Sequence, residues 1–253
     1  MSNPTKQLED FLGEEWIKHG HSFQDALREV IRYSQFLEVI KARVESASKE
    51  YIRLMHARMN TKHSYEILTK EDKEQVDALV HHALLVQLEI ESFYLFSKIY
   101  LDTTTRFLEA YFGQFNDFRF ESFEKLFQTN AAIWKYTHIL KFEPDFREVI
   151  QRLLPEIVSF RGKKITHPQL PGGRNLVGRR SHALTWKSDG SGSVSLTAGL
   201  TGAKSADEFY QSIDVRDLWK LIEQYTTLFI QFVGQNAENL KLRFKQTTRA
   251  EKE

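Results

Sequence analysis

The spacing of apolar residues between Phe23 and Met59 dictates a long amphipathic helix. Apolar side chains recur there mostly three or four positions apart, which places them on one face of an α-helix. At about 1.5 Å per residue, a helix of this length spans roughly 55 Å. An apolar face of that length is typical of a helix that packs against other long helices. The pattern therefore predicts a helical bundle.

A second long helix is predicted to begin after Thr69 and to run to about Tyr111. Thr69 and Asp72 form a cap-like pair at its start. Residues 79–96 are apolar nearly all round this helix, with no wholly polar face. This composition predicts that the helix lies centrally in the bundle. A shorter helix at residues 6–18 is expected to precede both long helices.

Two further helical segments are predicted in the middle of the chain. Aromatic residues between Glu121 and Leu140 indicate a single shorter helix. From Asp145 onward, an apolar pattern with a 3.6-residue period continues through Pro155, which predicts a kink at the proline. His167 precedes a proline, so this helix is expected to end there.

Residues 168–204 differ from the rest of the chain because they hold seven of its twelve glycines. A helix is therefore not expected in this stretch. Residues 184–187 and 194–197 flank a glycine-containing turn, which favours a small β-hairpin inserted into the bundle. The alternative, a disordered loop, stays open because short strands are weakly specified by sequence.

A last long helix is predicted after Asp214, where apolar residues again follow the helical period. The sequence shows no repeat of fixed period and no linker between two cores. We therefore predict one all-α domain over residues 1–253, a bundle of long antiparallel helices. The helices at residues 6–60 pack on its core, and residues 245–253 form a polar tail.

Composition excludes several classes of function. The chain has 35 basic and 34 acidic side chains, so its overall charge does not mark a nucleic-acid or membrane binder. It has no cysteine, which removes disulfides, thiolate nucleophiles and cysteine-based metal sites. The N-terminus lacks the pattern of a signal peptide, and Ala78–Leu101 carries too many polar groups for a lipid-facing span. A cytoplasmic protein with no membrane partner is expected.

The standard catalytic motifs are missing from the sequence. The nine histidines do not have metalloprotease spacing, and no serine lies in a nucleophile-elbow pattern. The glycines near residue 190 lack the lysine and the helix of a phosphate loop. We therefore expect neither a metal nor a cofactor.

The stretch that points to a function is IVSFRGKKITHP, residues 157–168. Arg161 lies four residues after Ile157 and four before Ile165, so helical geometry places it on the apolar stripe. A guanidinium does not lose its charge, so at that position it needs an anionic partner. From Arg161 to Lys187, both included, there are seven Lys or Arg and no Asp or Glu, which makes a local basic patch.

At these residues the sequence resembles the HEPN superfamily, whose helical-bundle domains often carry an Arg, four to six residues, and then a His. Arg161 and His167, within FRGKKITHP, match this pattern with five residues between them. Residues 90–102, IESFYLFSKIYLD, resemble the central helix of that family. The likeness extends in architecture over about residues 70–240. In the family a polar residue usually follows the Arg, and Gly162 stands at that position here.

The resemblance implies a homodimeric RNA-binding protein or metal-independent endoribonuclease, acting in stress response or phage defence. His167 would transfer a proton, and Arg161 would stabilise the charge that develops when an RNA 2′-hydroxyl attacks the adjacent phosphorus. Basic residues would hold the RNA backbone and an aromatic residue would stack on a base. These residues are Lys163, Lys164, Arg174, Arg179 and Arg180 for the backbone, and Trp186 for the base.

Acidic residues of the second long helix enter both this hypothesis and its alternative. Glu89, Glu91 or Asp102 would orient Arg161 in a catalytic site. In the alternative, one of them holds Arg161 in a structural ion pair, and the protein is a non-enzymatic helical scaffold or adaptor with a protein partner. Asp102 is expected to pair with Lys98 or Arg106, which lie four residues away on either side.

Interpretations of the same residues that involve no function stay open. Short motifs match by chance, and Arg58 with His63 also fits the Arg–His spacing. A basic run is often a solvated loop, and Trp186 has the size and shape of a small-hairpin core residue.

Overall fold

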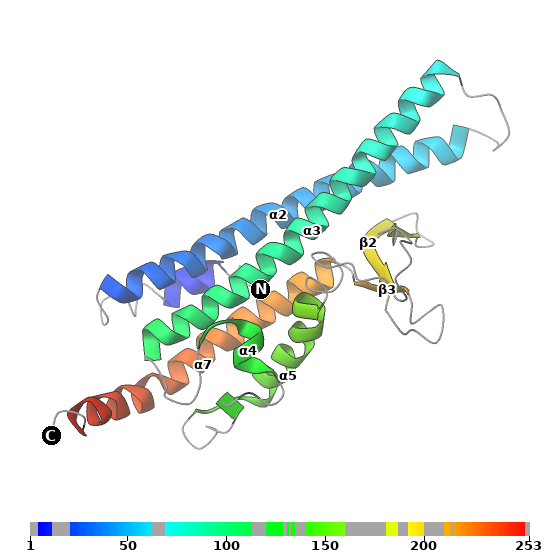
Figure 1. Ribbon diagram of the computed structural model, residues 1–253. Helices are drawn as coiled ribbons and strands as arrows, with labels where there is room; N and C mark the ends of the chain where they lie inside the picture. Colours follow the sequence, from blue (N-terminus) through cyan, green and yellow to red (C-terminus); the bar gives the residue numbers. More distant parts are fainter. Residues whose placement is uncertain are drawn as a thin grey trace, which may run out of the picture. The chain divides into compact units, whose positions relative to one another are not determined.

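The computed structural model describes most of the helical part of the chain and three short strands. The described residues are 5–11, 21–61, 69–112, 120–128, 131, 133–134, 140–159, 181–186, 192–199, 210–213 and 215–250. Only the backbone is described at residues 21–24, 59–61, 158–159, 181–186, 192–199, 210–213 and 237–250. Apart from these three short strands, the described part is a helical bundle, which confirms the predicted all-α fold class (Figure 1).

Long helices make up most of the described chain. The main helices are α2 His21–Thr61, α3 Lys70–Phe112, α4 Phe123–Phe127, α5 Pro144–Leu153 and α7 Val215–Ala250. Residues 5–11 are also helical. The helices predicted at residues 23–59 and 69–111 are therefore confirmed to within two residues at each end.

The chain divides into two compact units. The first unit comprises Met1–Leu37, Leu95–Arg161 and Trp219–Glu253, and the second comprises Glu38–Tyr94 and Gly162–Leu218. Helices α2, α3 and α7 each contribute residues to both units. The division is one of compactness, and the single domain stays a prediction.

A reciprocal capping box starts α3, as the sequence predicts. The backbone N–H of Thr69 donates to the Asp72 carboxylate at 2.6 Å, and the Asp72 N–H donates to the Thr69 hydroxyl at 3.3 Å. Two backbone donors at the helix start thereby gain acceptors. The acid in the first turn also interacts favourably with the positive end of the helix dipole.

In the second unit, the end of α2 and the start of α3 run antiparallel (Figure 1). The Arg43 guanidinium of α2 is ion-paired with Glu89 of α3. One heptad further along each helix lie Glu50 of α2 and His82 of α3. The pKa of the Glu50 carboxyl is lowered, mainly by the hydrogen bond from Arg53 and to a smaller extent by the nearby His82. A repeat of seven residues on both helices is typical of coiled-coil packing.

Aromatic side chains fill the core of the first unit. Tyr225 of α7 stacks on Phe146 of α5, with ring centroids 5.7 Å apart. Phe123 of α4 meets the same Tyr225 edge-on at 5.5 Å. The Asn236 side chain then ties α7 to the segment before α5, because it accepts from the Lys141 N–H at 2.8 Å and donates to the Lys141 carbonyl at 3.1 Å.

The single helix predicted between residues 121 and 140 is wrong. Helix α4 ends at Phe127, and Gln128 adopts an extended ψ of 157°. The Trp134 indole N–H donates to the Gln128 carbonyl at 2.9 Å. Thr129 and Asn130 follow in the sequence, and both have low helix propensity because their side chains compete for backbone groups.

The chain stays helical through Pro155, which confirms that the proline does not end the helix. Helix α5 ends at Leu153, and a wider π-helical turn continues from Leu154 to Ser159. A proline ring clashes with the carbonyl four residues before it and supplies no N–H to that carbonyl. A turn with an i→i+5 pattern relieves this clash. The predicted helix end at His167 lies outside the described residues.

Three strands are recorded in the glycine-rich half of the second unit. They are β1 Ser181–Trp186, β2 Gly192–Gly199 and β3 Tyr210–Ile213, joined in the order β1-β2-β3. Both pairings are antiparallel, with Leu184 opposite Val194 and Leu196 opposite Ile213. The side chains of these strands are not described, so the packing of the predicted insertion near residues 168–204 stays a prediction.

The central position predicted for the whole of α3 is correct only for part of the helix. Leu101 and Leu108 are fully buried in the first unit. In the second unit, Val80, Leu84 and Leu88 are 53%, 61% and 56% exposed. An apolar surface all round the helix thus does not bring burial on every side.

Candidate functional site

The two predicted catalytic residues, Arg161 and His167, lie outside the described residues. The same holds for the predicted RNA-backbone ligands: Lys163, Lys164, Arg174, Arg179 and Arg180. Trp186 ends strand β1, and its side chain is not described. The three predicted orienting acids, Glu89, Glu91 and Asp102, all lie within the described residues.

Glu89 is a buried carboxylate on α3. Its side chain is 7% exposed, and its Oε1 accepts from the guanidinium of Arg43, which is 60% exposed. Among the described residues, the second oxygen, Oε2, is buried and has no hydrogen-bond donor. A buried carboxylate oxygen without a donor is costly, so Glu89 retains capacity for one more cation or N–H.

Glu91 lies two residues further along α3 and is partly exposed. It accepts a hydrogen bond from the Gln87 amide at 3.0 Å, one turn back on the same helix. A contact of this kind is local to the helix surface and is worth little to stability. Nothing in its described geometry favours Glu91 over Glu89 as an orienting acid.

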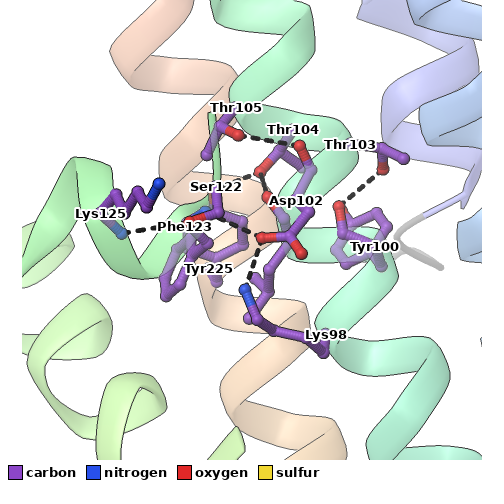
Figure 2. Close-up of polar contacts among 11 residues, drawn as sticks. Lys98, Tyr100, Asp102, Thr103, Thr104, Thr105, Ser122, Phe123, Lys125 and Tyr225 are labelled. Carbon is purple, nitrogen blue, oxygen red and sulfur yellow. Dashed lines mark hydrogen bonds and ion pairs between the residues drawn. The ribbon is translucent and has the colours of Figure 1, made fainter. Parts of the chain in front are cut away.

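Asp102 joins two elements of the first unit, as Figure 2 shows. Its Oδ1 accepts from the Lys98 ammonium at 2.6 Å and from the backbone N–H of Phe123, at the start of α4, at 2.9 Å. The predicted Lys98–Asp102 pair is confirmed, while Arg106 faces Glu29 of α2 at 3.8 Å. The Lys98 side chain is 8% exposed, so Asp102 neutralises a nearly buried charge and also anchors α4.

Next to this pair, hydroxyl groups form a buried polar seam between α3 and α7. The Tyr100 hydroxyl bonds to the Thr226 hydroxyl at 2.7 Å, and the Thr104 hydroxyl bonds to the Tyr225 hydroxyl at 2.7 Å. All four residues are 1% exposed or less. Because every hydroxyl finds a partner, the seam joins the helices without leaving an unsatisfied polar group.

Three consecutive threonines on α3 turn their hydroxyls to their own helix. Thr103, Thr104 and Thr105 each donate to the carbonyl three residues earlier, at 2.7–2.8 Å (Figure 2). These bonds allow a polar side chain to lie in the interior of a helix. They leave the Thr104 hydroxyl oxygen available as the acceptor for Tyr225.

The buried phenols of the seam are not poised for acid–base chemistry near neutral pH. Burial raises the pKa of Tyr100 and that of Tyr225 well above the ordinary value, and the hydrogen bonds to Thr226 and Thr104 offset only part of this. Both phenols therefore stay protonated and donate hydrogen bonds. The seam determines how α3 and α7 pack, and it supplies no general base.

The polar seam was not predicted from the sequence, although a local signal was present. The run Thr103–Thr105 interrupts the apolar α3, and Thr226 and Thr227 do the same on α7. Hydroxyl residues at core-facing helix positions need partners, which suggests that two such runs face each other. The pairing itself joins residues more than one hundred positions apart and cannot be derived from either run alone.

The described residues contain no group of three or more His, Asp or Glu side chains that could hold a metal ion. Within the same residues, no helix is both long and apolar enough to cross a membrane. Comparison of the chain with protein-family models, with curated proteins and with solved structures found no match.

Proposed function

We propose that this protein is a HEPN-like RNA-binding protein that cleaves RNA without a metal. The observation that carries the proposal is the charge pattern of residues 161–187, which hold seven Lys or Arg and no Asp or Glu. Such a patch is complementary to an anion, and a polyphosphate backbone supplies regularly spaced negative charge. The proposal includes a homodimer located in the cytoplasm. A chain without cysteine is compatible with that reducing compartment.

The donors that already surround one predicted acid, Asp102, support this proposal. Asp102 already receives the Lys98 ammonium and the Phe123 N–H. Glu89 receives Arg43 on one of its two oxygens. Asp102 is thus occupied by other donors, which favours an external anion for the basic patch, while Glu89 keeps one buried oxygen without a donor among the described residues.

The proposed chemistry needs two groups. His167 would exchange a proton with the attacking 2′-hydroxyl or the leaving oxygen, and Arg161 would stabilise the added charge on the phosphorus centre. The phosphorus–oxygen bond to the next nucleotide breaks as the 2′-oxygen bonds to phosphorus, so no metal-bound water is required. Lys163, Lys164 and the arginines at 174, 179 and 180 would hold the backbone, and Trp186 would stack on a base.

The test is an RNA cleavage assay in EDTA with purified protein. The wild type is expected to cleave, and the Arg161→Ala/His167→Ala variant is expected to lose cleavage. Arg58→Ala with His63→Ala is the matched control, because that pair has the same residue types at a similar spacing. The control should cleave like the wild type. Equal loss in both variants, or no cleavage by the wild type, would contradict the nuclease proposal.

RNA binding is tested separately from cleavage. Binding through the basic patch should weaken steeply as salt rises, because each phosphate contact releases counterions. Lys163→Ala with Lys164→Ala should reduce both the affinity and the salt dependence. Binding without cleavage would identify a non-catalytic RNA-binding protein.

A second candidate function has one observation in its favour. The Glu89 Oε2 is buried and lacks a donor among the described residues, and an arginine in a structural ion pair would provide one. In that case the protein is a helical scaffold or adaptor for a protein partner. Arg161→Ala would then lower the free energy of unfolding and leave RNA affinity unchanged. The proposed function instead predicts that Arg161→Ala lowers RNA affinity and leaves the free energy of unfolding unchanged.

A further inference from the structure

Helix α3 carries an exposed apolar face in the second unit. We define the outer seam as His81, Leu84, Leu88 and Glu91, with Leu84 and Leu88 61% and 56% exposed. Val80, which borders this seam, is 53% exposed. Monomeric proteins rarely expose large contiguous apolar patches, so this face is a candidate contact surface.

The outer seam has the spacing of a coiled-coil seam. Its members are three, four and three residues apart. The face of α3 that meets α2 has the same kind of spacing, at Val86, Glu89 and Phe93, which are all buried. Helix α3 therefore carries two seams, of which α2 covers one.

The charges around the outer seam decide between possible occupants. From Glu74 to Ser97 the chain has no Lys or Arg, and Asp77 is a further acid beside the seam. Anionic lipid headgroups and nucleic acids both prefer basic surfaces. Neither of these is complementary to a seam flanked by acids.

A second copy of the same helix is complementary when it runs antiparallel. A two-fold axis midway between Leu84 and Leu88 places each of these leucines opposite the other residue of the second copy. The same axis places His81 opposite Glu91, which pairs a base with an acid on both sides of the leucines. A parallel arrangement would instead place each residue opposite its own copy, so that Glu91 faces Glu91 and like charges repel.

We propose that the outer seam of α3 is the interface through which two copies of this chain associate, antiparallel and centred between Leu84 and Leu88. The proposal deepens the homodimer part of the proposed function by naming its surface, and it rests on α3 alone. With two leucines at its centre in each copy, the interface is small. Association is therefore weak and depends on protein concentration.

The test is sedimentation equilibrium of the full chain over a wide concentration range. The wild-type mass is expected to rise from that of one chain toward that of two. Leu84→Glu with Leu88→Glu should remain monomeric at the highest concentration, because four buried carboxylates would face one another. Val39→Glu is the matched control, since Val39 is 57% exposed on α2 and lies outside the seam, and it should behave like the wild type.

A charge exchange tests the antiparallel register. Glu91→Lys should raise the dissociation constant several-fold, because it places a lysine opposite a histidine. Adding His81→Glu should restore the wild-type dissociation constant, since acid and base again face each other in exchanged positions. All variants change exposed or partly exposed residues, and circular dichroism checks that their helix content is unchanged.

Three results would overturn the proposal. They are a wild type that stays monomeric throughout, a dimer that the leucine variant does not disrupt, and a charge exchange without rescue. None of them depends on RNA cleavage. A failure of the dimer surface is therefore distinguishable from a failure of the nuclease proposal.

Discussion

The two halves of α3 are both rich in apolar residues but differ in what covers them. In the first unit, the stretch from Lys98 to Leu108 is nearly all buried, and its polar groups bond to α4 and α7. In the second unit, α2 covers one side, and Leu84 and Leu88 remain exposed on another. Apolar periodicity thus indicates which faces a helix offers for packing, while tertiary structure determines which of these faces a neighbouring element covers.

The largest difference between the halves should appear when one leucine from each is shortened. Leu108→Ala removes a fully buried side chain and should lower the free energy of unfolding by about 3–4 kcal/mol. Leu84→Ala, at 61% exposure, should change it by less than about 0.5 kcal/mol in dilute protein. Urea denaturation measures both. Similar losses at the two positions would show that the outer half is buried within the monomer.

The ion pair at Asp102 gives the next largest effect. Asp102→Ala leaves the nearly buried Lys98 ammonium and the Phe123 N–H without their acceptor, and should cost about 3 kcal/mol. Asp77→Ala removes an exposed acid from the outer half of the same helix and should have little effect. A stable Asp102→Ala protein would mean that the carboxylate does not anchor α4.

The hydroxyl seam should contribute less for each bond. Tyr100→Phe and Tyr225→Phe each remove one buried hydrogen bond and should each cost about 1 kcal/mol. Tyr33→Phe is the control, because it removes a hydroxyl outside the seam and keeps the ring that packs on Phe36 and Phe96. Thermal or urea unfolding distinguishes the variants, and equal stability of all three would argue against the seam.

The same phenols predict the direction of a pH effect. Burial raises the pKa of Tyr100 and Tyr225 in the folded chain above the unfolded value of about 10. Their contribution to stability is therefore complete below about pH 10 and decreases as the pH rises toward the folded pKa. The Tyr100→Phe/Tyr225→Phe protein should lose less stability than the wild type between neutral and strongly alkaline pH. A parallel loss in both proteins would contradict the assignment.

Local sequence signals predicted the elements that depend on local physics. The Thr69–Asp72 capping box, the continuation through Pro155 and the Lys98–Asp102 pair all follow from groups within a few residues of each other. The break after Phe127 was missed because aromatic periodicity suggested one helix. There the competing factors were the low helix propensity that follows Gln128 and the hydrogen bond from Trp134.

The site was less predictable than the fold. The partner of Glu89 proved to be Arg43, which α2 brings from forty-six positions away. No spacing rule connects residues on two helices before their register is known. Arg161 and His167 lie outside the described residues, so their roles stay predictions from the sequence pattern, which the cleavage assay tests.

Hydrogen exchange along α3 in dilute and in concentrated protein tests the contrast between its halves within one molecule. Amides of residues 98–108 should exchange slowly at both concentrations, because the protein's own helices cover them. Amides of residues 77–91 should exchange faster in dilute protein and become more protected as the concentration rises, because a second copy then covers the outer seam. Protection of residues 77–91 that is the same at both concentrations would contradict this account of α3.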